Sequence, residues 1–116
     1  MEKVNIKQSI NSLPKTQQIA LWVIIRLPGS NDQDFSFRTS GFAAQFKKYA
    51  ADKVKFEEAK YGRFIGGLLS GLSRNKILAR VSGDRDTAWT LTNEIKDNLD
   101  DYKKYLFEVK VYWDNG

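Results

Sequence analysis

Apolar side chains in the middle of the chain recur with the period of an α-helix. Between residues 60 and 74 they fall within about a quarter-turn of one another at 100° per residue. The apolar side carries Tyr61, Ile65, Leu68, Leu69 and Leu72, and the opposite side carries Lys60, Arg63, Gly67, Ser70, Gly71 and Arg74. This pattern predicts an amphipathic helix with one basic face.

The segment after this helix largely alternates apolar and polar residues, which is typical of β-strands. The alternation covers residues 76–81 and 87–91, and the sequence SGDRD at 82–86 separates them. Gly and Asp tolerate turn conformations, so we predict a β-hairpin with its turn at 82–86. Residues 35–38 also alternate and predict a short first strand that pairs with the hairpin.

A nearly continuous apolar run at residues 17–27 predicts a helix that is buried in the centre of the domain. Pro14 fits its first turn, Ser12 is a candidate N-cap, and Pro28 with Gly29 ends it.

Another helix is predicted from about Gly41 to Ala51, with Thr39 or Ser40 as its N-cap. Residues 52–56 would link it to the basic-faced helix. Glu57 and Glu58 would lie in the first turn of that next helix, where its dipole favours acidic side chains.

A fourth helix is predicted to follow Thr92, its candidate N-cap, with Ile95, Leu99, Tyr102 and Leu106 on one side. The final segment, from Leu106 to Trp113, alternates apolar and charged residues and predicts a strand. A lone strand needs a partner, so we expect a homodimer through the fourth helix and this tail. The domain divides into an N-terminal arm (1–12), a folded unit (13–106) and a C-terminal strand-like tail (107–116).

The order of these elements resembles the winged-helix DNA-binding family. That family's recognition helix ends in a leucine-rich stretch, followed by a short x-Ile-Leu strand, a wing, and an aromatic-x-Leu-Thr strand. The corresponding stretches here are IGGLLSGL (65–72), KIL (76–78) and WTLT (89–92), and the resemblance covers roughly residues 16–106. It implies a winged helix-turn-helix fold, which is mainly α with a small β-hairpin (α+β), and a DNA-binding function.

Three glycines in the basic-faced helix each cost about 1 kcal/mol relative to Ala. Two interpretations of Gly66, Gly67 and Gly71 remain open. Bare backbone on the basic face would let the helix lie close to a duplex groove. Alternatively, Gly66 and Gly71 allow close packing on a neighbouring helix, or the helix breaks near Gly71.

Composition narrows the chemistry that the chain can perform. The 116 residues include no Cys and no His, which excludes disulfides, thiolate metal sites and the commonest general base. We therefore expect neither an enzyme nor a cofactor or metal site. The N-terminal residues lack the apolar run of a signal peptide, and the longest apolar stretch, 19–25, is too short to cross a bilayer. We expect an intracellular, cytoplasmic protein that makes no membrane contact, with nucleoid association as an option.

Charge is distributed unevenly along the chain. The net charge is +5, but residues 38–80 contain ten basic and three acidic residues, while residues 84–101 contain six acidic and two basic ones. Such polarity suits a protein with one surface facing a polyanion.

We therefore predict a double-stranded DNA-binding protein, a small transcriptional regulator that uses the helix at 60–74 and the wing at 82–86. The predicted DNA-binding residues are Lys60, Arg63, Ser70 and Arg74 in the major groove, Arg38, Lys47, Lys48 and Lys55 on phosphates, and Arg80 and Arg85 in the wing. Two other functions fit the same residues: a protein-interaction subunit of a larger assembly, and an RNA-binding module.

Overall fold

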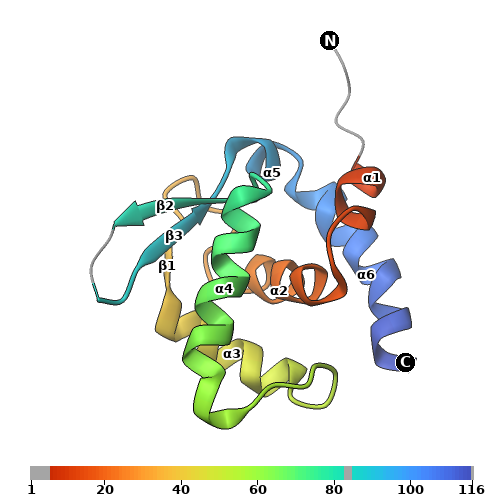
Figure 1. Ribbon diagram of the computed structural model, residues 1–116. Coiled ribbons are helices and arrows are strands. Elements are labelled where there is room, and N and C mark those ends of the chain that lie inside the picture. The colour runs from red at the N-terminus through yellow and green to blue at the C-terminus, as the bar shows by residue number, and fades with distance from the viewer. Residues whose placement is uncertain (1–5, 83–84, 116) are drawn as a thin grey trace.

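A computed structural model describes residues 6–82 and 85–115 and shows a mainly helical protein with a three-stranded antiparallel sheet (Figure 1). The strand order is β1-β3-β2. The elements in chain order are α1 (Ile6–Asn11), α2 (Lys15–Ile25), β1 (Phe37–Arg38), α3 (Thr39–Ala50), the short 3-10 helix η1 (Glu58–Lys60), α4 (Tyr61–Arg74), β2 (Leu78–Ser82), β3 (Ala88–Leu91), α5 (Asn93–Asp97) and α6 (Leu99–Asn115).

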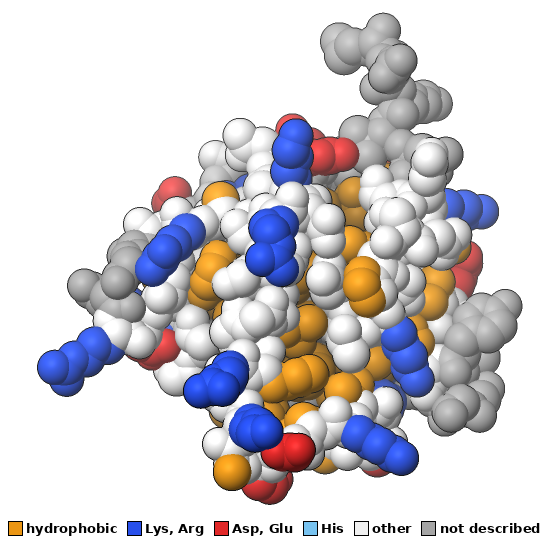
Figure 2. Space-filling model, viewed as in Figure 1, with side chains coloured by type: hydrophobic (Ala, Val, Ile, Leu, Met, Phe, Trp, Pro, Cys, Tyr) orange, Lys and Arg blue, Asp and Glu red, His pale blue; other side chains and the backbone are white. Residues whose placement is uncertain are grey.

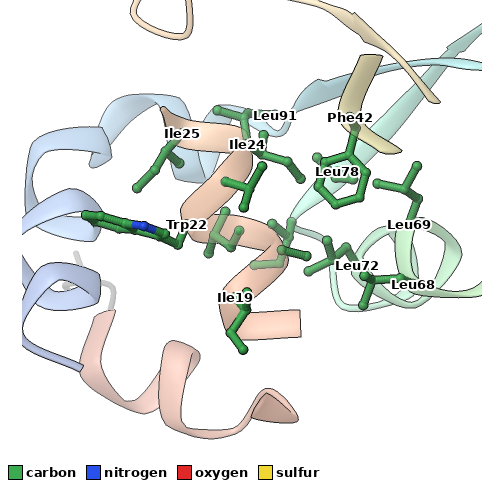
Figure 3. Close-up of a cluster of buried hydrophobic side chains, with 14 of the residues drawn as sticks. Ile19, Trp22, Ile24, Ile25, Phe42, Leu68, Leu69, Leu72, Leu78 and Leu91 are labelled. Carbon is green, nitrogen blue, oxygen red and sulfur yellow. The ribbon is translucent and has the colours of Figure 1, made fainter. Parts of the chain in front are cut away.

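The core forms around α2, in which every residue from Ile19 to Ile25 is buried. Figure 3 shows this helix between the N-terminal half of the chain's last helix, which Trp22 approaches, and α4, which contributes Leu68 and Leu72. Phe42 of α3 closes the core from a third side. The prediction of a central buried helix at 17–27 is confirmed, although the helix ends at Ile25.

The amphipathic pattern of α4 is confirmed, because Ile65, Leu68, Leu69 and Leu72 are all buried. Gly71 is an exception, since it is buried and not on the exposed face. A β-carbon at Gly71 would lie 2.7 Å from Nε2 of Gln17 in α2, so the interpretation of close helix packing is confirmed at this position. It is wrong for Gly66, where a β-carbon would meet nothing within 4 Å, and α4 does not break before Arg74.

The sheet matches the predicted hairpin and first strand. β3 pairs with both neighbours. Its Trp89 lies opposite Phe37 of β1, and its Leu91 lies opposite Leu78 of β2. β2 is therefore an edge strand. In the predicted turn at 82–86, residues 83 and 84 lie outside the described residues.

The prediction of a C-terminal strand is wrong, because α6 is helical as far as Asn115 and packs on α1 and α2. The alternating pattern at 106–113 also satisfies a helical repeat. Leu106, Val109 and Trp113 are spaced by three and four residues, and Leu106 and Trp113 are buried while Val109 packs on the core. The fourth helix is also interrupted at Asn98, and the N-terminal arm contains α1.

Two predicted helix starts are also wrong. The Ser12 hydroxyl donates to the carbonyl of Ser9, and the residue before α2 is Pro14, which provides no side-chain cap. The basic-faced helix does not carry Glu57 and Glu58 in its first turn, since α4 starts at Tyr61 after η1. Thr92 does occupy the position before α5, but its hydroxyl donates to the carbonyl of Lys76 and not to α5.

The glycines of α4 should differ in their effects on stability. We expect Gly66→Ala and Gly67→Ala each to raise the free energy of unfolding by about 1 kcal/mol, since both have open space for a methyl group. Gly71→Ala should gain less, because the Gln17 amide must move away from its hydrogen bond with Asn75 (2.7 Å). Urea denaturation of the three variants measures this. Equal stabilisation at all three positions would contradict the packing role of Gly71.

Candidate nucleic-acid interface

The outer face of α4 presents polar and basic side chains because the opposite face is held in the core. Lys60, Arg63, Ser70 and Arg74 are all exposed, in agreement with the amphipathic pattern. Figure 2 shows Lys and Arg side chains standing out across the surface that α4 and the hairpin form, with acidic side chains mostly near its edges. Apolar and uncharged side chains separate the cations, so the basic surface is dispersed.

The basic residues near the start of α4 are partly neutralised. Lys47 of α3 lies 2.8 Å from a carboxylate oxygen of Glu58, and Lys60 lies 3.3 Å from one of Glu57. Both pairs are solvent-exposed, and such pairs contribute only about 0–1 kcal/mol. A phosphate group can therefore replace either glutamate at small cost. Glu57 thus pairs with Lys60, and Glu58 pairs with Lys47. Of the two acids, only Glu58 lies in the first turn of η1.

Arg63 and Arg74 differ from these two lysines. Neither forms an ion pair with any residue in the described part of the chain, and both are exposed on α4. Arg74 lies in the last turn of α4, where its charge complements the helix dipole. Lys76, which the site prediction omitted, is also exposed two residues further on and adopts a positive φ of 63°. Only the three-dimensional turn after α4 distinguishes Lys76 from the other surface lysines.

Tyr61 supports the interface from below and does not extend into it. Its hydroxyl donates to the carbonyl of Ala43 (2.5 Å), which ties the start of α4 to α3. Burial raises the pKa of the Tyr61 hydroxyl above its usual range, and the Lys47 ammonium lies 5.4 Å from the centre of its ring. This agrees with the prediction that Tyr61 belongs to the core side of the helix.

The hairpin contributes two further exposed arginines. Arg80 lies on the edge strand β2, opposite Trp89, and Arg85 lies just before β3. The neighbouring Val81 is 57% exposed, which is unusual for a large apolar side chain in this protein. The hairpin thus combines positive charge with an apolar side chain at the end of the sheet.

Two of the predicted phosphate contacts lie apart from α4. Lys48 borders a depression between α2 and α3, together with Trp22, Arg26 and Tyr49. Lys55 is exposed in the loop that connects α3 to η1. The structure therefore groups Arg63, Arg74, Lys47 and Lys60 around α4, whereas Lys48 faces a different part of the surface.

The start of α3 is bonded to the base of the hairpin. Arg38 occupies the position before this helix, so the prediction that Thr39 or Ser40 is the N-cap is wrong. The Ser40 backbone N–H donates to Oδ1 of Asp86 (2.9 Å), and the Ser40 hydroxyl donates to Oδ2 (2.5 Å). Asp86 therefore provides the cap from a segment that is distant in sequence. Arg38 also donates to the Asp86 carbonyl (2.9 Å) and so holds the predicted phosphate-binding guanidinium against the hairpin.

Acidic side chains gather on other elements. Asp97, Asp100 and Asp101 are exposed on α5 and α6 and border a shallow depression with Asn31 and Lys96. α2 lies between α4 and α6 (Figure 1), so Asp100 and Asp101 of α6 lie on a different side of α2 from α4.

Comparison with known proteins adds no assignment: no family model, no curated protein and no solved structure matches the chain. None of the helices in the described residues has the length and apolar character needed to cross a membrane.

The Asp86 cap should make stability depend on pH. Hydrogen bonds from the Ser40 hydroxyl and backbone lower the pKa of the Asp86 carboxyl, and the Arg38 charge acts in the same direction. A lowered pKa in the folded state stabilises the protein above the pKa of the unfolded state, and this stabilisation is lost as pH falls through the folded value. We expect the melting temperature of wild type to drop relative to that of Asp86→Asn when the pH is lowered below about 4.

The Ser40→Ala variant tests the cause of this pH dependence. Removing the hydroxyl donor should make the loss of stability at acid pH smaller, because the carboxylate then has one fewer hydrogen bond and its folded-state pKa lies closer to that of the unfolded state. Thermal melts of the three proteins between roughly pH 2 and pH 7 measure the effect. A wild-type profile parallel to that of Asp86→Asn would contradict the role of the carboxylate.

Proposed function

We propose that this protein binds double-stranded DNA as a winged helix-turn-helix protein, with α4 as the recognition helix and the β2–β3 hairpin as the wing. Its biological context would be that of a small transcriptional regulator. The observation that carries the proposal is the exposed row of Arg63, Ser70 and Arg74 on α4, beside a hairpin that carries Arg80 and Arg85. The order of α3, α4 and the hairpin fits this fold as well.

The proposed roles follow from where each side chain lies. Lys60, Arg63, Ser70 and Arg74 would enter the major groove, where hydrogen bonds to base edges confer sequence specificity. Arg38 and Lys47 would contact phosphates, which fix position and supply affinity. Arg80 and Arg85 would contact the neighbouring minor groove or backbone. With few candidate base readers, part of the specificity would come from DNA shape.

Gly67 supports a close approach of α4 to a duplex. It is exposed on the basic side, and a β-carbon there would meet nothing within 4 Å, so packing inside the protein does not require glycine. A helix without a side chain at this point brings its backbone nearer to a ligand. We therefore interpret Gly67 as allowing the backbone of α4 to lie close to the duplex.

A protein-interaction subunit is the second candidate. The dispersed cations and the apolar side chains between them (Figure 2) would also suit an acidic protein partner, whose interface would combine both kinds of contact. Under this alternative, α4 would bind no duplex even at low salt, where electrostatic attraction is strongest.

The first test measures binding to a random-sequence duplex across a salt series. We expect the affinity of wild type to fall steeply with salt, since bound phosphates release counterions. Arg63→Ala should make the slope of log K against log salt shallower, by up to about one unit, because it removes one positive charge from the surface that faces the duplex. Fluorescence anisotropy with labelled duplex gives both slopes.

Lys7→Ala is the matched control, because Lys7 is an exposed cation on α1 and lies over the ring of Tyr105, away from α4. It should leave the slope unchanged. Absence of wild-type binding at low salt would overturn the DNA proposal in favour of a protein partner. Stronger competition by duplex or single-stranded RNA would reassign the interface to RNA.

We also propose that the protein is a homodimer that associates through α6, the helix that includes the segment predicted to be a strand. Phe107 is 63% exposed on α6, and its ring centre lies 6.2 Å from that of Trp22. Lys104 and Glu108 are exposed one turn apart on the same side. An antiparallel copy related by a two-fold axis near residue 106 would place each Lys104 against the Glu108 of its partner, with the two Phe107 rings beside the axis.

Charge reversal tests this arrangement. Lys104→Glu and Glu108→Lys should each weaken self-association, because each places like charges opposite one another, and the double variant should restore it. Phe107→Ser should also dissociate the dimer, whereas Val81→Ser, the same kind of change at an exposed site in the hairpin, should not. Sedimentation equilibrium measures the wild type and the five variants. A monomeric wild type, or a double variant without recovery, would refute this interface.

A further inference from the structure

The contact between the hairpin and α3 involves an acidic residue on a surface where basic residues predominate. Asp86 lies one residue after Arg85 and binds Ser40 through both of its carboxylate oxygens. A carboxylate next to a DNA backbone opposes binding, since it repels the phosphates. Its presence there calls for a compensating role.

We propose that Asp86 is a positioning residue, which fixes the hairpin against the start of α3 so that Arg85 reaches DNA. This inference rests on the proposed DNA-binding function. It assigns to Asp86 no contact with the nucleic acid. Asp86 would favour binding only through the orientation of the hairpin.

The start of α3 needs a partner because its first N–H groups have none within the helix. The preceding residue, Arg38, has no acceptor that could cap them. The Ser40 N–H is satisfied by the Asp86 carboxylate, and the Thr39 N–H donates to the carbonyl of Thr87 (3.0 Å). Two consecutive hairpin residues thus complete the end of α3, and the carboxylate also complements the positive end of the helix dipole.

Further hydrogen bonds fix the orientation of the hairpin relative to the start of α3. The Thr39 hydroxyl donates to the Thr87 carbonyl (2.9 Å), and the Trp89 indole N–H donates to the Thr39 hydroxyl oxygen (2.9 Å). The Arg38 guanidinium donates to the Asp86 carbonyl (2.9 Å). Residues 38–40 donate all of these bonds except the one from the Trp89 indole, and together the bonds fix the relative position of the two segments more tightly than a single bond would.

These bonds attach the hairpin to the start of α3, whereas the buried Leu78, Trp89 and Leu91 attach its base to the core and β2 contacts α4. β1 pairs with β3 at only two positions, Phe37 with Trp89 and Arg38 with Ala88. Arg85 lies before this pairing begins, next to the Asp86 cap. Loss of the cap would leave Arg85 attached to α3 only through its neighbours along the chain.

The comparison of Asp86→Ala with Asp86→Asn isolates this role, since both variants remove the same charge. Asparagine retains an acceptor for the Ser40 N–H and is a good capping residue, whereas alanine has no acceptor. We expect Asp86→Asn to bind a random duplex at least as tightly as wild type, because one repulsive charge is lost. Asp86→Ala should bind roughly fivefold more weakly than Asp86→Asn, in line with the loss of one capping interaction.

A double-mutant cycle with Arg85→Ala separates positioning from general destabilisation. If Asp86 acts by placing Arg85, the difference between the Ala and Asn variants should shrink to less than about twofold when Arg85 is absent. A purely structural role would leave that difference unchanged. Binding is measured well below the melting temperature of every variant, with circular dichroism to confirm that each is folded.

The outcomes distinguish this proposal from the proposed function. No binding by wild type at low salt would refute DNA binding itself. Wild-type binding with equal or tighter binding by Asp86→Ala than by Asp86→Asn would refute the positioning role alone. So would an Ala–Asn difference that persists without Arg85.

Discussion

The burial of α2 determines where the other elements lie. A helix with seven consecutive buried residues, Ile19 to Ile25, exposes apolar side chains in every direction around its axis. Each large apolar side chain contributes about 1.5–3 kcal/mol when it is removed from water, so stability requires a cover on all sides. α3, α4 and α6 provide this cover, and the apolar side of α4 is thereby held inward. The outward direction of the basic face of α4 follows from the core.

Periodic patterns in the sequence predict those parts of the fold that depend on burial. The apolar side of α4, the central helix and the three strands were all predicted because each repeat matches a single type of element. The tail from 107 onward was assigned incorrectly because its short alternation fits two periods. Packing on α1 and α2 selects the helix, and no local pattern contains that information. The exposure of the ten predicted site residues also followed from the pattern.

Hydrogen bonds between distant segments were beyond the reach of such patterns. Asp86 had been assigned only to a turn, and its cap on Ser40 joins residues 46 positions apart. Gln17 and Asn75, which pair beside the buried Gly71, are separated by 58 positions. The ion pairs of Lys47 and Lys60 likewise depend on how the loop before α4 is folded. The sequence therefore predicts which residues belong to the candidate site better than it predicts which side chains they contact.

The architecture connects the fold of this site to its charge. Helix ends expose N–H groups that need acceptors, and carboxylates are among the strongest available. A basic surface built around helix ends and a hairpin therefore retains some acids for structural reasons, as at Asp86 and the Ser40 N–H. Glu57 and Glu58 differ, since they pair with exposed lysines that can exchange them for phosphates. Counting charges treats these three acids alike, whereas the structure separates one that bonds the hairpin to α3 from two that form exposed ion pairs with lysines.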